Sequence, residues 1–168
     1  MGQQWSLKDR LQPSLLDRLT DLEPDKKLEL SSQQVLSQKQ FKDAVIRDLG
    51  WLLNSVSLEC VFDLGAYPEV RHSVLNYGLP DISGHTASSV DTVMLEKTLH
   101  RAISEFEPRI IQHSLKVRVR SNPDDMSHNS LVFEIEGVVF GQPLPFQVVL
   151  RSELDLESGE FSVNEDSG

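Results

Sequence analysis

The stretch Phe106-Glu107-Pro108-Arg109-Ile110 lies where the hydrophobic pattern of the chain changes its period. Before it, apolar residues recur at the spacing of an amphipathic helix, and after it they alternate with charged residues as in a strand. Pro108 cannot continue a helix, because proline lacks the main-chain N–H and its ring clashes with the preceding turn. We therefore expect a helix to end here and a sheet to follow, with opposite charges side by side at the junction.

Two amphipathic helices are expected before the junction. The first runs from about residue 38 to 55 and opens with a capping box, in which Ser37 caps the helix and Gln40 reaches back. The second is expected to be capped by Ser88, with Asp91 three residues on. Their apolar stripes are Phe41, Ala44, Val45, Leu49, Leu52, Leu53 and Val56, and then Val90, Val93, Met94, Leu99, Ala102, Ile103 and Phe106.

The segment between these helices, residues 56–87, is irregular and rich in proline and glycine. Pro68 is expected to open a short helix that runs through Leu75, and Gly78 is expected to end it. Loops of this length in compact domains are often functional.

Alternating apolar and polar residues predict an antiparallel sheet after the junction. Strands are expected from Leu115, from Leu131 and from Phe146, followed by a closing hairpin over residues 154–163. Gly137 suggests a bulge in the second strand. On the open face, basic and acidic residues can pair across strands, namely Lys116, Arg118 and Arg120 with Glu134 and Glu136.

Helices followed by a sheet predict an α+β domain with two main amphipathic helices packed on one face of a small antiparallel sheet, and with a C-terminal hairpin. This single domain is expected over residues 37–164, before a frayed tail at 165–168. A polar segment, residues 1–36, precedes it and contains a short helix at 13–22. The helix carries Leu15, Leu16 and Leu19 on one face. So short a helix is marginal alone in water, so it must dock on its own domain or on a partner.

Composition narrows the function classes. The formal net charge of -10 argues against broad nucleic-acid binding, and no apolar run is long enough to span a bilayer. The single cysteine, Cys60, is expected to be a small core residue. Because one cysteine cannot form an intrachain disulfide, we expect a cytoplasmic protein. The five histidines are scattered, and no phosphate-binding, dinucleotide-binding or zinc-binding motif is present, so neither a cofactor nor a metal is expected.

Catalysis would have to use the carboxylates beside Phe106. Glycoside hydrolysis needs a pair of carboxylic groups, and Glu105 and Glu107 are the candidates. Arg109 favours the ionised form of Glu107, which is the wrong form for a general acid. The same pair of charges suits a structural role if it is partly buried, whereas an exposed salt bridge would contribute little.

Four stretches in this order resemble the TssE family, baseplate proteins of the bacterial type VI secretion system. That family is related to the tail-wedge baseplate proteins of contractile phages, which are often labelled lysozyme-like. The stretches are Pro13-Ser14-Leu15-Leu16-Asp17-Arg18-Leu19, Arg47-Asp48-Leu49-Gly50-Trp51-Leu52-Leu53-Asn54, residues 67–81 (Tyr67-Pro68-Glu69-Val70-Arg71 to Tyr77-Gly78-Leu79-Pro80-Asp81) and Phe106-Glu107-Pro108-Arg109-Ile110.

The resemblance implies a structural, non-enzymatic wedge subunit in the bacterial cytoplasm, assembled at a baseplate docked on the inner membrane without inserting into it. It implies contacts with the wedge proteins TssF, TssG and TssK, and with the first ring of the contractile sheath, built of TssB and TssC. Glu107, Pro108 and Arg109 would bind the wedge. The C-terminal strands, including Phe161 and Val163, would offer a free edge for strand addition by a sheath subunit, which would help sheath assembly to nucleate.

Two other functions stay open at this point. One is a peptidoglycan-degrading, lysozyme-like enzyme that uses Glu105 and Glu107. The other is a stand-alone regulatory binding module of a similar α+β fold.

Overall fold

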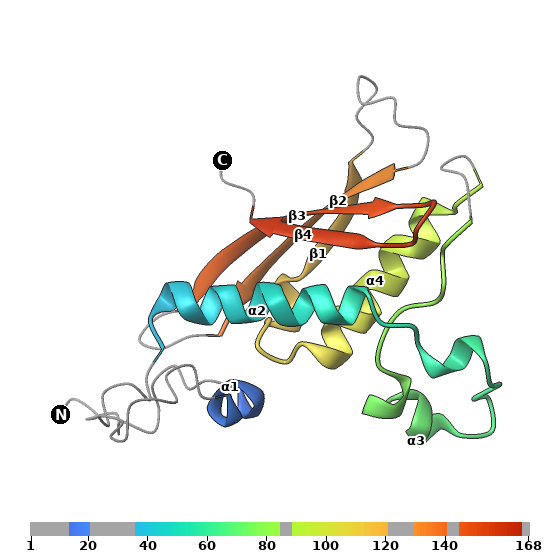
Figure 1. Cartoon of the computed structure of the whole chain (residues 1–168), viewed down its shortest axis with the longest axis horizontal. Coiled ribbons are helices and arrows are strands. Elements are labelled where there is room, and N and C mark those ends of the chain that lie inside the picture. Colours follow the sequence, from blue (N-terminus) through green and yellow to red (C-terminus); the bar gives the residue numbers. More distant parts are fainter. Residues whose placement is uncertain (1–13, 21–35, 85–88, 121–129, 141–144, 166–168) are drawn as a thin grey trace.

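The computed structural model describes residues 14–20, 36–84, 89–120, 130–140 and 145–165. Its α-helices are α1 (Leu15–Leu19), α2 (Gln38–Leu53), α3 (Pro68–Arg71) and α4 (Thr92–Phe106), with 3-10 turns η3 (Leu58–Cys60), η4 (Val74–Asn76) and η5 (Gln112–Ser114). The strands β1 (Lys116–Arg120), β2 (Ser130–Val139), β3 (Phe146–Asp155) and β4 (Phe161–Glu165) form one antiparallel sheet in the order β1-β2-β3-β4. Figure 1 shows this α+β arrangement, which confirms the predicted fold class.

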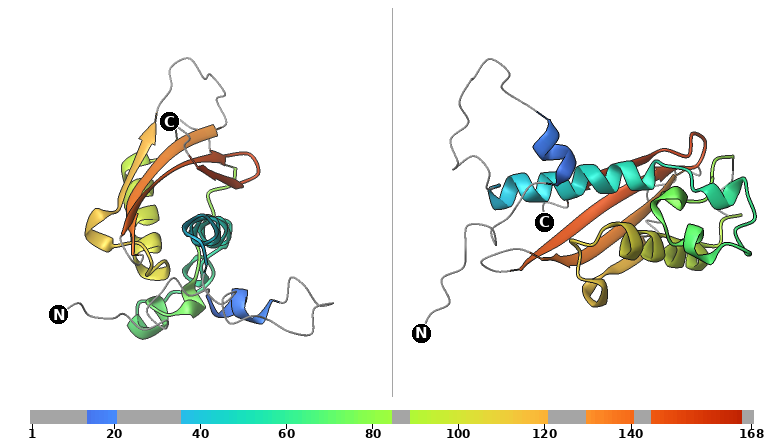
Figure 2. Two further views of the ribbon diagram at one scale, coloured as in Figure 1. Left: turned by 90° about the vertical axis from the view of Figure 1, so that its left-hand side faces the viewer. Right: turned by 90° about the horizontal axis from the view of Figure 1, so that it is seen from below.

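The two long helices, α2 and α4, lie against the same face of the sheet, as the end-on view in Figure 2 shows. The fully buried side chains come from both layers, namely Val45, Leu49, Leu52, Leu99 and Ile103 from the helices and Phe133, Ile135, Val139, Val148, Leu150 and Leu154 from the strands. Burying each such side chain contributes about 1.5–3 kcal/mol. No helix among the described residues is long and apolar enough to cross a membrane.

The predicted capping box of α2 is confirmed. The Ser37 N–H donates to Gln40 Oε1 (2.9 Å), and the Gln40 N–H donates to Ser37 Oγ (3.2 Å). The helix ends at Leu53 with Asn54 as its C-cap, two residues before the expected end. Val56 therefore lies beyond the helix and is exposed, so its predicted place on the core stripe is wrong.

Helix α4 begins later than predicted. Asp91 is its N-cap and accepts a hydrogen bond from the Met94 N–H (3.0 Å), whereas the expected cap, Ser88, lies outside the described residues. The prediction that Val93 and Met94 face the core is wrong, since they are 56% and 65% exposed. Starting the helical period at Leu95 instead leads to the buried positions Leu99, Ala102 and Ile103.

The predicted cross-strand pairing is found in part, since Lys116 lies opposite Glu136 and Arg118 opposite Glu134, whereas Arg120 lies opposite Val132. Gly137 does not form the expected bulge, because β2 and β3 stay in continuous register through it. A Cβ atom at this position would lie 2.9 Å from the Ile110 side chain. The glycine therefore permits a close approach of the junction to the sheet rather than a break in the strand.

The segment between α2 and α4 is anchored to the end of α2 by a short parallel bridge between Val56 and Leu79. Gly78 makes this possible at φ +123°, since a Cβ there would lie 2.3 Å from the Ser55 carbonyl oxygen. Pro68 opens a helix as predicted, but α3 is only four residues long and Leu75 falls in the separate turn η4. Cys60 was expected in the core, and this is wrong because the side chain is exposed at the end of η3.

Candidate functional site

The junction after α4 is a tight turn that main-chain hydrogen bonds attach at both ends. Glu107 is the C-cap of α4, and the Ile110 N–H donates to the Glu107 carbonyl (3.1 Å), which closes a turn over Pro108. Main-chain bonds of 2.8 and 2.9 Å then join Arg109 and Ile111 to the end of β2. The residue before a proline avoids the helical region, so Pro108 both stops α4 and helps to fix the turn.

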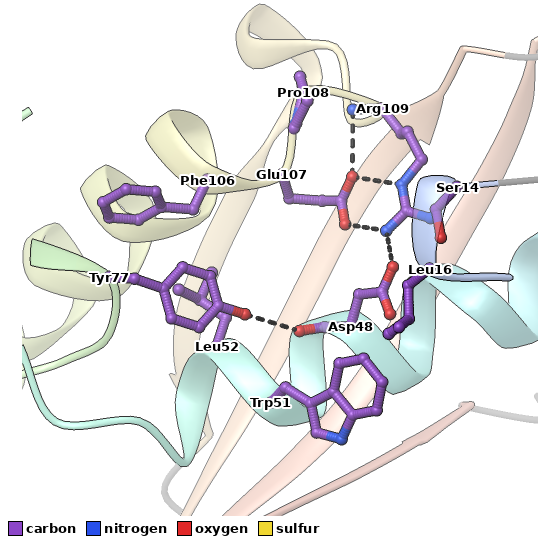
Figure 3. Close-up of a pocket in the computed structure, with 10 residues that line it drawn as sticks. All are labelled: Ser14, Leu16, Asp48, Trp51, Leu52, Tyr77, Phe106, Glu107, Pro108 and Arg109. Carbon is purple, nitrogen blue, oxygen red and sulfur yellow. Dashed lines mark hydrogen bonds and ion pairs between the residues drawn. The ribbon is translucent and has the colours of Figure 1, made fainter. Parts of the chain in front are cut away.

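This turn places Arg109 between two carboxylates. Glu107 is 4% exposed, and its Oε1 accepts from Arg109 Nε (2.6 Å) and from the Arg109 N–H (3.1 Å), while its Oε2 accepts from Nη2. Nη2 also donates to Oδ2 of Asp48 on α2 (2.7 Å), as Figure 3 shows. Burial disfavours the charged guanidinium, but the hydrogen bonds and charges of Glu107 and Asp48 outweigh burial and raise the pKa of Arg109.

The ionic contacts continue from Asp48 to the N-terminal helix. Asp48 Oδ1 accepts from Nη2 (2.7 Å) and Nε (2.9 Å) of Arg47, and Arg47 Nη1 donates to Asp17 Oδ1 on α1 (2.5 Å). The hydrogen bond to Asp17 raises the pKa of Arg47, and the same bond lowers the pKa of Asp17. Asp17, Arg47, Asp48, Arg109 and Glu107 therefore form one series of alternating charges, called here the charge chain.

An open pocket of about 420 Å³ lies beside the charge chain (Figure 3). Its lining residues are Ser14, Leu16, Asp48, Trp51, Leu52, Tyr77, Phe106, Glu107, Pro108 and Arg109. The rings of Tyr77 and Phe106 pack edge to face at 5.4 Å, and the Tyr77 hydroxyl donates to the Asp48 carbonyl at 3.4 Å. Burial, followed by the charges of Asp48 and Glu107, raises the pKa of Tyr77. The lining of the pocket is largely apolar. Its charged groups, Asp48, Glu107 and Arg109, are already paired with one another.

Helix α1 contacts its own domain, one of the two outcomes that the sequence left open. It lies on the far side of α2 from the sheet, as Figures 1 and 2 agree. The contact is ionic, through Asp17, whereas Leu15, Leu16 and Leu19 are 69%, 49% and 74% exposed. The apolar face of α1 is thus not used for docking, apart from Leu16 at the rim of the pocket.

The C-terminal candidates lie on the other side of α2. Phe161 and Val163 are on β4, an outer strand, and neither lines the pocket. The Phe161 side chain is 5% exposed and belongs to the core, while Val163 is partly buried against it. Only the main chain of these residues faces the edge of the sheet.

The carboxylates do not have the arrangement of a glycosidase pair. Both oxygens of Glu107 accept hydrogen bonds from Arg109, so the carboxyl group is turned toward Arg109 and not toward a second carboxylate. Glu105 Oε1 contacts His72 Nδ1 (2.8 Å) at the surface. Within the described residues there is no group of three or more His, Cys, Asp or Glu side chains that could hold a metal ion.

The family of the chain follows from a comparison with family models. A model described as baseplate wedge protein gp25 matches residues 39–144, which is more than half of the chain. The chain belongs to the family of baseplate wedge protein gp25. No curated protein and no solved structure gave a match.

The baseplate wedge match includes the junction and most of the pocket. It contains α2, α4, β1, β2 and four of the five members of the charge chain, while Asp17 on α1 precedes it and β3 and β4 follow it. Sequence reasoning had selected Glu107 and Arg109 but had given no role to Asp48 or Tyr77. The available signal was their presence in stretches that resemble TssE, since spacing along the chain does not indicate that positions 48, 77 and 109 meet.

Proposed function

We propose that the chain is a structural baseplate subunit of a type VI secretion system. In this proposal it binds the wedge proteins TssF, TssG and TssK, contacts the first ring of the TssB and TssC sheath, and helps nucleate sheath assembly in the bacterial cytoplasm. One observation carries the proposal. All ten residues of the pocket belong to the four stretches that resemble TssE, although Ser14 and Arg109 are 95 positions apart in the sequence.

The pocket is the surface proposed to bind the wedge. The Nε and Nη2 groups of Arg109 donate hydrogen bonds to Glu107 and Asp48. The main effect of Arg109 is therefore to hold the turn in place rather than to bind an acidic partner. Leu16 and Trp51 are exposed apolar side chains at the rim, and α1 also exposes Leu15 and Leu19, which do not line the pocket. We therefore expect a wedge partner to insert a large apolar side chain beside Pro108, as buried anchors do in protein interfaces.

The sheath is proposed to bind at β4, away from the pocket. An outer strand exposes unpaired main-chain groups, and an extended segment of another protein can pair with them. Since the Phe161 side chain is in the core, Phe161 and Val163 would contribute main-chain hydrogen bonds to such pairing rather than side-chain contacts.

Leu16→Asp tests the wedge contact while every residue of the charge chain stays in place. Leu16 is 49% exposed at the rim of the pocket, so an aspartate there costs little folding energy but puts a charge into an apolar contact. The matched control is Met94→Asp, on α4, where the side chain is 65% exposed and does not line the pocket. We expect Leu16→Asp to lose co-purification with TssF, TssG and TssK, and Met94→Asp to retain it.

Two outcomes would contradict the wedge contact: full co-purification of Leu16→Asp, or equal loss in Met94→Asp, with circular dichroism showing both variants folded. Arg109→Glu is less informative, because it would bring a third carboxylate against Glu107 and Asp48. Its loss of binding would not separate a lost contact from a disrupted domain.

A further inference from the structure

The outer strand β4 carries an unusual contact with a side chain of α2. The Phe161 N–H donates to Asn54 Oδ1 (2.8 Å), and Asn54 Nδ2 donates to the Phe161 carbonyl (2.9 Å). A single amide group therefore bonds both main-chain groups of one strand residue, as a neighbouring strand would. Asn54 Nδ2 also donates to the Gly50 carbonyl (2.8 Å), so both amide hydrogens are used and the orientation of the amide is determined.

The direction of the Phe161 groups defines which part of the edge is open. Main-chain groups in an antiparallel strand point alternately to the two sides. Because those of Phe161 point away from β3, those of Val163 and Glu165 do so too, while Ser162 and Asn164 face β3. Among the described residues, none bonds the outward main-chain groups of Val163. The edge of β4 is thus closed at Phe161 and open at Val163.

The opposite edge of the sheet is closed by a different chemical group. On β1, the Val119 N–H donates to Oε1 of Glu96 on α4 (2.7 Å). A carboxylate accepts hydrogen bonds but cannot donate one, so it blocks an approaching strand both by charge and by lacking a donor. The amide of Asn54 differs from this carboxylate in both respects. It is neutral, and it offers one donor and one acceptor in the pattern of a peptide group.

We infer that Asn54 is a gate on the edge of β4: it occupies Phe161 in the free subunit and is replaced, bond for bond, by an extended segment of the partner. While Asn54 occupies Phe161, an added strand can pair with the outward main-chain groups of two residues, Val163 and Glu165. When Asn54 leaves, Phe161 becomes the third. Asn54 is exposed at the C-cap of α2, so its side chain can leave Phe161 without opening the core. This inference rests on the proposed addition of a sheath strand at β4.

Hydrogen exchange of the full chain, measured by NMR, tests the contact itself. In the wild type, the Phe161 amide should exchange slowly despite its place on an outer strand, and Asn54→Ala should accelerate it about tenfold. The amides of Ser162 and Asn164 should not change. The matched control is Ser55→Ala, which removes a bond to the last turn of α2 (Ser55 Oγ to the Trp51 carbonyl, 2.7 Å) but none to β4.

Equal acceleration of Phe161 exchange in Ser55→Ala would overturn the inference, because Phe161 would then report only fraying of α2. No acceleration in Asn54→Ala would also overturn it, because Asn54 would then not protect the Phe161 amide.

Binding of the full chain to purified TssB–TssC sheath subunits tests the gate. Asn54→Ala should raise the association rate about tenfold, since no bonds to Phe161 need to break first. An unchanged or slower rate would overturn the gate. If neither the wild type nor Asn54→Ala binds the sheath subunits while Phe161 exchange still accelerates, the proposed sheath contact fails and the gate with it. Asn54 is then only a cap that protects the edge.

Discussion

Replacing Arg109 with methionine should lower the free energy of unfolding by about 3 kcal/mol. Glu107 is 4% exposed, and among the described residues its side chain accepts hydrogen bonds only from Arg109, so Arg109→Met leaves a buried carboxylate without a cation. Removing one partner of a buried ion pair costs about 3–5 kcal/mol. We expect the lower end of this range, because the Arg109 side chain is 21% exposed and water can reach the vacated space.

Urea denaturation followed by circular dichroism measures this loss, and the transition temperature should fall by about 6–12 °C. The double variant Glu107→Gln/Arg109→Met removes the buried charge as well as its partner. It should recover about 1–2 kcal/mol, since an unpaired buried charge costs more than an unpaired amide. A loss below about 1 kcal/mol for Arg109→Met would mean that the Glu107–Arg109 pair contributes no more than an exposed salt bridge, and it would refute the reasoning. The absence of recovery in the double variant would equally refute the reasoning.

Three further perturbations test other parts of the fold. Ser152→Ala should raise the free energy of unfolding by about 1 kcal/mol in urea denaturation, because the fully buried hydroxyl has no hydrogen-bond partner among the residues that the structure describes. Gly78→Ala should lower it by at least about 2 kcal/mol, since the new Cβ would meet the Ser55 carbonyl at a positive φ. The contact between Asp17 and Arg47 should be complete at neutral pH and should persist below pH 3.8, the ordinary pKa of an aspartate, before it is lost, because the hydrogen bond from Arg47 lowers the pKa of Asp17 in the folded state. An NMR titration of the Asp17 carboxyl group measures this, and a midpoint at or above pH 3.8 would contradict it.

The layout of the fold could be predicted from the sequence because its signals are local. The alternation around Val117 and Ile135 defines strands, and the pairing of Ser37 with Gln40 defines a helix start. The buried face of α4 was misplaced because local spacing does not determine it. Val93 and Met94 are apolar and fit a helical period, but the burial of Leu95 decides which face is turned inward, and only tertiary packing determines that.

The site could be predicted only in part. Glu107 and Arg109 are neighbours in sequence, so their pairing was visible, whereas their link to Asp48 depends on how α2 crosses the end of α4. Asn54 was expected inside the first helix and was given no role beyond its place in a stretch that resembles TssE. Its bonds to Phe161 join residues 107 positions apart, and nothing in the local pattern of either segment indicates them.

The charge chain also constrains how this protein can change by mutation. Within the charge chain each ion pair joins residues of opposite sign, so reversing Arg47 or Asp48 alone creates two repulsive contacts at once. Exchanging the two residues keeps them attracted to each other, but it creates repulsive contacts with Asp17 on one side and with Arg109 on the other. All of the contacts stay attractive only if every charge in the charge chain is reversed together. The effect of a mutation at Asp17 on α1 should therefore depend on which residue stands at position 109, in the turn after α4.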